Sequence, residues 1–418
     1  MNKFSKIILY GHPNSSRAYQ LRDFLKRSVI DFDWIELTDV CGFLEEKKIQ
    51  SSEEEFSSYI VFPDRQCIVS PSIEDVVKAM GCINEPQHQE YDLSIYGSGP
   101  AGLSAAVYAA SEGLKTVLVE RSAIGGQAGT SSLIENYMGF PEGISGAQLA
   151  ENARQQALKF GVEILLLREG VRGEFKNNRI YADLASGDKL VAKSNICATG
   201  VEYRKLNIEG EDKYLHRGLY YGAGSSEATL CQDEDVYVIG GGNSSGQAAM
   251  NFSSYARSVT MVVRGNDLAS SLSHYLIKKI EQTDNIQVLF NTELVELSGE
   301  KHLEAITLNN KKTQKRTVQP TRKLFICIGG VPNTAWSRDT DIICDKNGYL
   351  LTGHDLHQQS NFQQTWTLER PPYSLETSVP GCFAAGDVRF GSVKRVASAV
   401  GEGAMAVTIV HKYLKKNF

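Results

Sequence analysis

Residues 91–102 read YDLSIYGSGPAG, a short apolar segment that leads into a glycine-rich turn. The apolar segment predicts a β-strand, and the Ala-rich stretch from Leu103 to Ser111 predicts a helix. A second apolar segment, residues 116–119, predicts the next strand, and Glu120 follows it about 20 residues after the first glycine. A G-x-G-x-x-G turn between a strand and a helix, with an acidic residue at this distance, is the fingerprint of a dinucleotide-binding βαβ unit.

Each glycine of this turn has a separate physical role. Gly97 allows the tight turn, Gly99 lets the backbone approach a pyrophosphate, and Gly102 lets the helix pack closely on the strand. The start of the helix presents free N–H groups and a partial positive charge to the phosphates. The carboxylate of Glu120 can accept hydrogen bonds from a ribose. We therefore expect this unit to bind a dinucleotide.

The same pattern occurs a second time. Residues 236–239 predict a strand, Gly240-Gly241-Gly242-Asn243-Ser244-Ser245 forms the turn, and residues 246–255 and 259–263 predict a helix and a strand. Val263 stands in the place of Glu120, and Arg264 follows it. This unit offers a cation for a 2′-phosphate and no acid for a free 2′-hydroxyl, which favours NADPH unless Arg264 is only a solvated cation. Two such units in one chain indicate hydride transfer from a nicotinamide to a flavin.

The composition narrows the class of protein. The 418 residues are 42% hydrophobic, and Lys+Arg (44) against Asp+Glu (49) give a net charge of −5, which argues against a nucleic-acid partner. No apolar run reaches the roughly 18 residues of a membrane span, and the N-terminal apolar run is too short for a signal peptide. We therefore expect a cytoplasmic protein with no membrane partner. The eight cysteines form no C-x-x-C pair and no zinc spacing, so we expect reduced, mostly buried thiols and no metal site.

The first 87 residues predict a separate small α/β domain. The apolar patterning predicts strands at 7–10, 32–37 and 59–62 and helices at 17–27 and 73–80. A polar segment with Pro86 then predicts a linker that ends where the pattern at Tyr91 begins.

From Tyr91 to its C-terminus the chain resembles the low-molecular-weight thioredoxin reductase family. The matching motifs, in order, are Gly97–Gly102, Gly125-Gly126-Gln127, Ile134-Glu135-Asn136-Tyr137, Ala198-Thr199-Gly200, Gly240–Ser245, Ile328-Gly329 with Pro332-Asn333-Thr334, and Ala385-Gly386-Asp387-Val388. The resemblance implies an α/β protein of thioredoxin reductase fold with two Rossmann-like domains. One is an FAD domain made of residues 90–206 and 324–418, and the other is an NAD(P)H domain inserted at 207–323. It also implies a homodimer.

The resemblance assigns cofactor-binding residues position by position. For FAD they are Gly97, Gly99, Pro100, Ala101, Gly102, Glu120, Arg121, Gly126, Gln127, Asn136, Thr199, Gly200, Gly386, Asp387, Arg395 and Val396. For NADPH they are Gly240, Gly242, Asn243, Ser244, Ser245, Arg264 and Gly329. In the family, Asp387 corresponds to a residue at the ribityl chain, and the stretch around Arg395 runs past the pyrimidine edge of the flavin. No residue stands out as catalytic.

The chain departs from the family at the redox dithiol. The family carries C-A-T-C before the second nucleotide strand, but here Gly222 and Ser225 occupy the places of the two cysteines, and Cys231 is out of register. The N-terminal domain resembles a glutaredoxin or thioredoxin-like domain, with His12-Pro13-Asn14-Ser15 where C-P-Y-C would stand and Ser58 in the place of the usual proline. Serine does not cycle as a thiolate does, so disulfide reduction cannot use either site.

These observations favour an FAD-dependent oxidoreductase that is reduced by NAD(P)H and passes electrons directly to an external small-molecule or protein acceptor. Two alternatives stay open: a substrate oxidase that uses FAD and oxygen and has a vestigial NADPH site, and a flavin- or NADPH-binding sensor that docks a partner. Tyr220 and Tyr221 either cover a flavin face or pack in a core. His216, His354 and His357 are predicted to be surface histidines, and residues 311–316 a solvated hairpin turn.

Overall fold

The computed structural model describes residues 6–13, 15–52, 55–80, 85–131, 133–222, 228–359, 362, 366 and 368–418. The chain forms two compact units. One contains residues 1–76, 130–132 and 203–329, and the other contains residues 77–129, 133–202 and 330–418. The boundaries at 87, 206 and 323 stay predictions, and Asn14 and Ser225 lie outside the described residues.

The unit that holds the first glycine turn is built on a seven-stranded sheet. Its strand order is β7-β6-β5-β10-β9-β8, and β21 also pairs with β10. The strands are β5 (Tyr91–Tyr96), β6 (Thr116–Glu120), β7 (Glu163–Leu166), β8 (Gly170–Lys176), β9 (Arg179–Leu184), β10 (Lys189–Cys197) and β21 (Cys382–Ala384). Strands β7, β6, β5, β10 and β21 run parallel, whereas β9 pairs antiparallel with β10 and β8 pairs antiparallel with β9. Parallel strands joined through helices bury both faces, which explains the continuous apolar runs.

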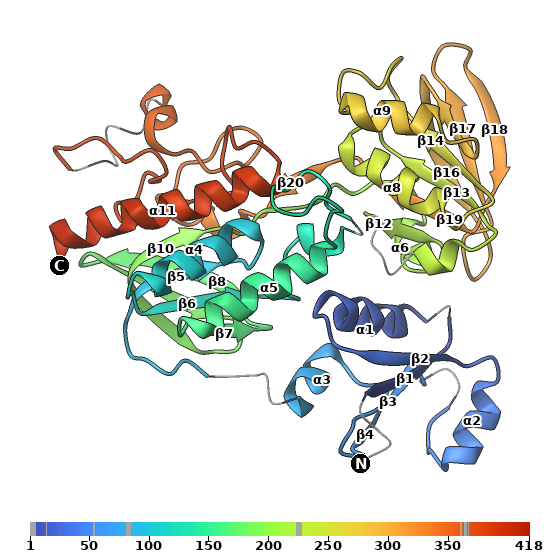
Figure 1. Cartoon of the computed structure of the whole chain (residues 1–418), viewed down its shortest axis with the longest axis horizontal. Coiled ribbons are helices and arrows are strands. Elements are labelled where there is room, and N and C mark those ends of the chain that lie inside the picture. Colours follow the sequence, from blue (N-terminus) through green and yellow to red (C-terminus); the bar gives the residue numbers. More distant parts are fainter. Residues whose placement is uncertain are drawn as a thin grey trace. The chain divides into compact units, whose positions relative to one another are not determined.

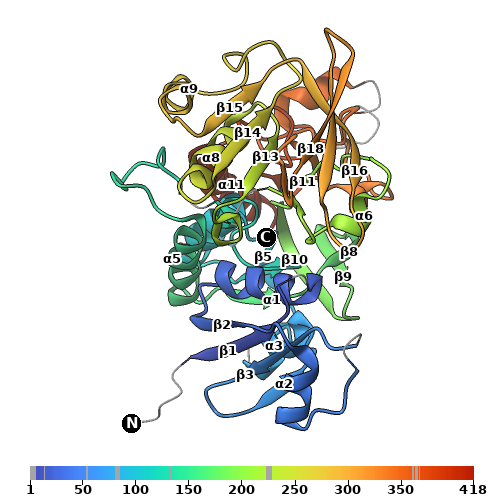
Figure 2. The same ribbon diagram turned by 90° about the vertical axis from the view of Figure 1, so that its right-hand side faces the viewer.

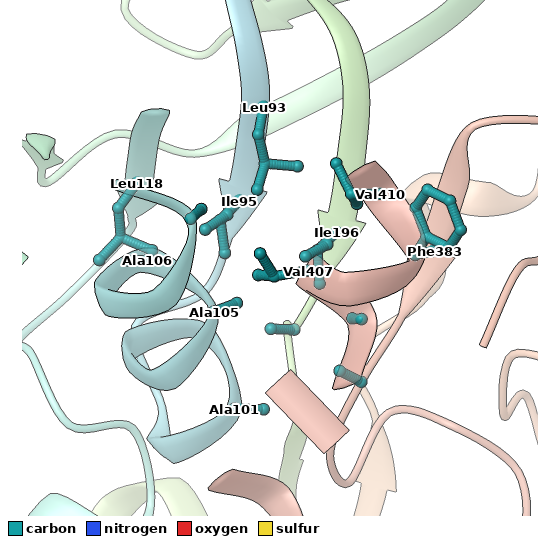
Figure 3. Packing of buried hydrophobic residues seen from close by; sticks show 14 of the residues in the cluster. Leu93, Ile95, Ala101, Ala105, Ala106, Leu118, Ile196, Phe383, Val407 and Val410 are labelled. Atoms are coloured by element: carbon teal, nitrogen blue, oxygen red, sulfur yellow. The ribbon is translucent and has the colours of Figure 1, made fainter. Parts of the chain in front are cut away.

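Among the residues that the structure describes, the longer helices of this unit are α4 (Pro100–Ser111), α5 (Gly146–Lys159) and α11 (Val396–Asn417). The alanines of α4 allow close packing against β5, β10 and α11, as Figure 3 shows for Ala106 beside Ile95 and Ala105 beside Val407. Helix α4 begins at Pro100, three residues earlier than the apolar pattern predicts, because proline at the first helical position lacks an N–H that would be unpaired there anyway. The glycine motif therefore runs into the helix itself. Figure 1 shows the course of these elements.

The second nucleotide unit contains a five-stranded parallel sheet of order β12-β19-β13-β14-β15 and a three-stranded antiparallel sheet of order β16-β17-β18. Strands β13, β14 and β15 lie side by side in Figure 2. The strands are β12 (Leu219–Tyr221), β13 (Asp235–Ile239), β14 (Ser258–Val262), β15 (Ile286–Leu289), β16 (Thr292–Ser298), β17 (Ala305–Asn310), β18 (Lys315–Pro320) and β19 (Lys323–Ile326). The helices among its described residues, which leave out 223–227, are α6 (Glu211–Tyr214), α8 (Asn243–Ser253), α9 (His274–Glu281) and the short η2 (Thr229–Cys231). The predicted exposed turn at 311–316 joins β17 to β18 and is confirmed.

The N-terminal part of the chain forms a mixed four-stranded sheet of order β2-β1-β3-β4. Its elements are β1 (Ile7–Gly11), α1 (Ser16–Arg27), β2 (Phe32–Glu36), α2 (Val40–Lys47), β3 (Ser58–Val61), β4 (Cys67–Val69) and α3 (Ile73–Ala79). Strand β1 pairs in parallel with β2 and antiparallel with β3. The predicted strands and helices are confirmed, but sequence analysis missed α2 and β4, which are short and lack a clear period.

Helix α1 contacts the second nucleotide unit, with which it shares one compact body. The Tyr19 ring stacks on His216 at a centroid distance of 4.6 Å and lies 5.4 Å from Tyr220. The prediction that His216 is a surface histidine is therefore wrong, because α1 covers its ring. His354 and His357 are exposed, as predicted.

The remaining short elements connect the larger ones. They are η1 (Ala128–Thr130), β11 (Val201–Tyr203), β20 (Gly330–Pro332), η3 (Ala335–Ser337) and η4 (Gly353–Gln358). Strands β11 and β20 pair with each other.

Candidate functional site

The first glycine turn has the shape that a pyrophosphate site requires. A Cβ atom on Gly97 would lie 2.4 Å from the carbonyl oxygen of Ala198, and one on Gly102 would lie 1.8 Å from that of Gly97. A Cβ on Gly99 would meet nothing within 4 Å, so the space in front of this residue is open. Gly99 caps α4 without a side-chain hydrogen bond, which leaves the first N–H groups of the helix, including that of Ala101, available to an anion.

Glu120 is buried at the end of β6 and is already hydrogen-bonded within the chain. Its Oε2 accepts from the N–H and hydroxyl of Ser98 at 2.8 and 2.7 Å, and its Oε1 accepts from the N–H and hydroxyl of Ser122 at 2.7 and 3.0 Å. A ribose hydroxyl would take the place of a serine hydroxyl, which can rotate towards another acceptor. Sequence analysis missed both serines, although Ser98 lies inside the glycine motif.

A cavity of about 320 Å³ opens beside Glu120. This volume is at the low end of the range of roughly 300–1,000 Å³ for small-molecule sites, so it fits part of a dinucleotide. Arg121 at the cavity pairs with Glu202 and lies 3.7 Å from Glu169. With its amide turned to suit this arginine, the Asn333 side-chain oxygen accepts from Arg121 at 3.2 Å. Arg121 therefore forms part of the cavity wall, held there by these polar contacts.

The residues of the later FAD motifs fall at different places in the same unit. A Cβ on Gly126 would lie 3.0 Å from the Cα of Gly99, so this motif packs directly on the glycine turn. Gln127 donates to the carbonyl oxygen of Val201 at 3.0 Å. The hydroxyl of Thr199, a lining residue of the cavity, donates to the carbonyl oxygen of Asn333 at 2.8 Å.

Two further predicted FAD residues, Gly200 and Asn136, do not line the cavity. The carbonyl oxygen of Gly200 accepts the N–H of Asn333 at 3.0 Å, next to the cavity. Asn136 is exposed in the loop that leads to α5.

The C-terminal FAD motif also lies near the start of α4. A Cβ on Gly386 would lie 2.9 Å from the Cβ of Ala101. Burial raises the pKa of the neighbouring Asp387, and the charge of Lys394 opposes that shift. Arg395 caps α11 without a side-chain hydrogen bond, and Val396 opens the helix. The uncapped start of α11 can thus offer N–H donors to the electron-rich pyrimidine edge of a flavin, which the family resemblance places near Arg395.

The second glycine turn is built like the first, with one substitution. A Cβ on Gly240 would lie 2.3 Å from the carbonyl oxygen of Cys327, whereas one on Gly242 would meet only the Ser271 carbonyl oxygen at 3.9 Å. Ser245 replaces the third glycine and is accommodated because its hydroxyl donates to the Gly242 carbonyl at 2.7 Å. The turn therefore keeps open space at its middle glycine.

The remaining NADPH candidates surround the start of α8. Asn243 opens the helix and its Oδ1 accepts the N–H of Ser273 at 2.8 Å, while Ser244 is exposed beside it. Helix α8 begins three residues before the predicted start, so the turn motif again runs into the helix. Arg264 is exposed just beyond β14, and Gly329 is exposed beyond β19. The structure thus brings these residues to the carboxyl ends of the parallel strands, where nucleotides bind in open α/β sheets.

Gly222, the residue expected in the place of the family's first cysteine, is in close contact with an aromatic side chain. Gly222 has φ +77°, and a Cβ on it would lie 2.3 Å from the hydroxyl oxygen of Tyr203. Tyr220 is buried and stacks on Phe325 with ring centroids 5.2 Å apart, which favours the packing interpretation. Tyr221 donates its hydroxyl to Glu211 at 2.6 Å. Sequence analysis missed Tyr203, because nothing in the chain near it marks its contact with Gly222.

The expectation that the cysteine thiols are mostly buried is met only in part. Cys197, Cys231 and Cys382 are buried and Cys327 and Cys344 are half-buried, but Cys41 and Cys67 are exposed. Cys231 belongs to the hydrophobic core around Phe252 and Phe325.

No described helix is both long enough and apolar enough to cross a membrane.

Comparison with known proteins places residues 91–403 under a family model described as pyridine nucleotide-disulphide oxidoreductase. A thioredoxin reductase of Treponema pallidum is 33% identical over 325 residues, which is 78% of this chain and 97% of that protein. Thioredoxin reductase 1 of Saccharomyces cerevisiae is 32% identical over 334 residues, 77% of this chain and 97% of that protein. The crystal structure of Lactococcus lactis thioredoxin reductase matches 78% of this chain and 99% of its own, with a TM-score of 0.69 and 29% identity.

Proposed function

Because the chain belongs to the pyridine nucleotide-disulphide oxidoreductases and is an FAD- and NAD(P)H-dependent oxidoreductase of thioredoxin reductase type, we propose that it works without an internal disulfide. Its electrons leave the flavin directly for an external acceptor. When bound, FAD supplies the two-electron chemistry that links a nicotinamide to that acceptor. Oxygen, a quinone, a small oxidised substrate and an iron–sulfur protein are the acceptor classes to test.

The contact between Gly222 and Tyr203 carries the proposal. A cysteine at position 222 would need a left-handed backbone conformation, and its Cβ would overlap the Tyr203 ring, whose Cζ would lie 2.6 Å away. The position is therefore closed to a side chain, and not merely changed from cysteine to glycine.

Cys197, Cys382 and Cys344, three of the cysteines that the structure describes, are poor substitutes for a redox dithiol. The Sγ atoms of Cys197 and Cys382 lie 3.9 Å apart, but the neighbouring Cys382 thiol and burial raise the pKa of Cys197 well above its usual range. Burial also raises the pKa of Cys344. A thiol that resists ionisation is a poor nucleophile for exchange with another disulfide.

The N-terminal domain is proposed as a thioredoxin-like module that has lost its redox pair and serves as an interaction or regulatory domain. The β2-β1-β3-β4 sheet, with α1 following β1 directly, supports this proposal. Ser15, at the end of the predicted motif, caps α1 by accepting the N–H of Ala18, so it has a structural task. Tyr19, one turn later, provides the contact to His216 and Tyr220.

Anaerobic titration with NADPH tests the proposal. We expect the flavin to bleach after the uptake of about two electrons per subunit, the capacity of a flavin alone, where a flavin plus a disulfide takes up about four. Turnover with a soluble acceptor should resist thiol alkylation, and the protein should not reduce thioredoxin. A four-electron endpoint contradicts the proposal, and its loss in Cys231→Ser or Cys382→Ser would identify the thiol involved.

The same titration separates the alternatives. Slow or absent bleaching by NADPH, with rapid bleaching by an organic substrate, would favour the substrate oxidase. Bleaching without steady turnover on any acceptor class would favour the sensor. A homodimer is proposed from the family alone and is tested by the mass of the protein in solution.

A further inference from the structure

The cavity beside Glu120 has buried polar side chains in its lining. Asn195 and Tyr96 both line it, as do the charged Glu120 and Arg121. Asn195 is only 3% exposed, and its Oδ1 has no hydrogen-bond partner in the chain. The hydroxyl of Tyr96 is likewise buried, and the hydroxyl of Ser94 on the same strand interacts with it. Buried polar atoms are almost always hydrogen-bonded, so the unpartnered Asn195 oxygen facing a cavity indicates a place that a ligand completes.

The strand register explains why these side chains meet. In the parallel pair β5–β10, Ile95 is opposite Ile196, and both enter the apolar core on the helix side of the sheet. The alternate residues Tyr96 and Asn195 must therefore point to the opposite side. There, Gly170 of β8 makes room for the phenol ring, since a Cβ on it would lie 3.1 Å from the Tyr96 ring.

The rest of the cavity fits a flat heterocycle. Phe175 and Trp336 contribute aromatic walls, and Glu120 supplies an acceptor for a ribose at the same cavity. Aromatic rings stack favourably on a planar base. An asparagine amide matches adenine in particular, because it can accept from the 6-amino group and donate to a ring nitrogen beside it.

We propose that the Asn195 amide and the Tyr96 hydroxyl bind the adenine edge of FAD and make this site selective for an amino-bearing base. The inference rests on the proposed function, since it takes the cavity as the adenosine end of the flavin site. The Asn195 Nδ2 now lies 3.4 Å from the Sγ of Cys197, a weak contact that a ring nitrogen of the base would replace.

Binding of FAD and of one analogue to the flavin-free full chain tests the proposal. The analogue carries a hydrogen in place of the 6-amino group of adenine, so it leaves the Asn195 oxygen unpartnered without adding a new acceptor. We expect the dissociation constant, followed by flavin fluorescence, to be roughly tenfold or more higher for the analogue than for FAD. Asn195→Leu should remove most of this preference, and Tyr96→Phe should weaken FAD binding while it keeps the ring.

The controls separate folding from recognition. Asn251→Leu changes another amide with an unpartnered buried nitrogen, on α8 and away from this cavity, so the preference for FAD should stay unchanged. A melting temperature for each variant shows that it is folded. Equal binding of FAD and the analogue by the unmodified chain overturns the inference, as does a full preference in Asn195→Leu. A folded protein that binds neither flavin instead contradicts the proposed function.

Discussion

Gly222→Ala measures how firmly Tyr203 closes position 222 to a side chain. The left-handed conformation at φ +77° costs an alanine about 1–2 kcal/mol. The overlap of the new Cβ with the Tyr203 hydroxyl, at 2.3 Å, adds about 1–3 kcal/mol because the ring must swing away from its site. Gly210 is the matched control, since its φ is +79° but a Cβ there would meet its nearest neighbour, in Tyr214, at an ordinary 3.6 Å.

Urea and thermal unfolding of the variants give the comparison. We expect Gly210→Ala to lose about 1–2 kcal/mol and Gly222→Ala about 2–5 kcal/mol of unfolding free energy. In a Tyr203→Ala background, the cost of Gly222→Ala should fall to that of Gly210→Ala, because only the backbone term remains. Equal losses for Gly222→Ala and Gly210→Ala in the unmodified chain would contradict this expectation, since Tyr203 would then not occupy the place of a side chain at 222.

Three further outcomes are expected. Arg264→Ala should cut the preference for NADPH over NADH about ten- to hundredfold, because a charge-assisted bond to the 2′-phosphate contributes about 1.5–3 kcal/mol. The preference is measured as the ratio of the rates of flavin reduction by the two nucleotides. Equal rates in the unmodified enzyme would make Arg264 a surface residue. Gly99→Val should fold normally yet bind no FAD, whereas Gly102→Ala should fail to fold stably, because only the second meets backbone, at 1.8 Å. Burial, and then the charge of Lys205, lower the pKa of His216 from 6.5 to about 4, so stability is fully present above about pH 6.5 and falls as the pH drops to 4. The free energy of unfolding should fall by about 3 kcal/mol between these two pH values. Urea titrations of His216→Phe should lack this part of the pH dependence.

The two nucleotide-binding βαβ units of this protein could be predicted from local sequence patterns. The motif from Tyr91 to Glu120 and its second copy predicted strand, turn, helix and strand in the right places, because a local pattern of apolar residues and glycines sets local backbone geometry. The open space at Gly99 and Gly242 and the close approaches at Gly97 and Gly102 agree with the roles expected of those glycines.

Tertiary structure alone decided what surrounds these motifs. Tyr203 and Gly222 meet, Tyr96 and Asn195 face one cavity, and Tyr19 covers His216, although each pair is far apart in the chain or on different strands. Such meetings depend on strand register and on how helices pack, and a one-residue change of register would turn Tyr96 or Asn195 to the other face of the sheet. For this reason the sequence predicted only that glycine stands where the family has a cysteine, whereas the contact of Gly222 with Tyr203 came from the packing.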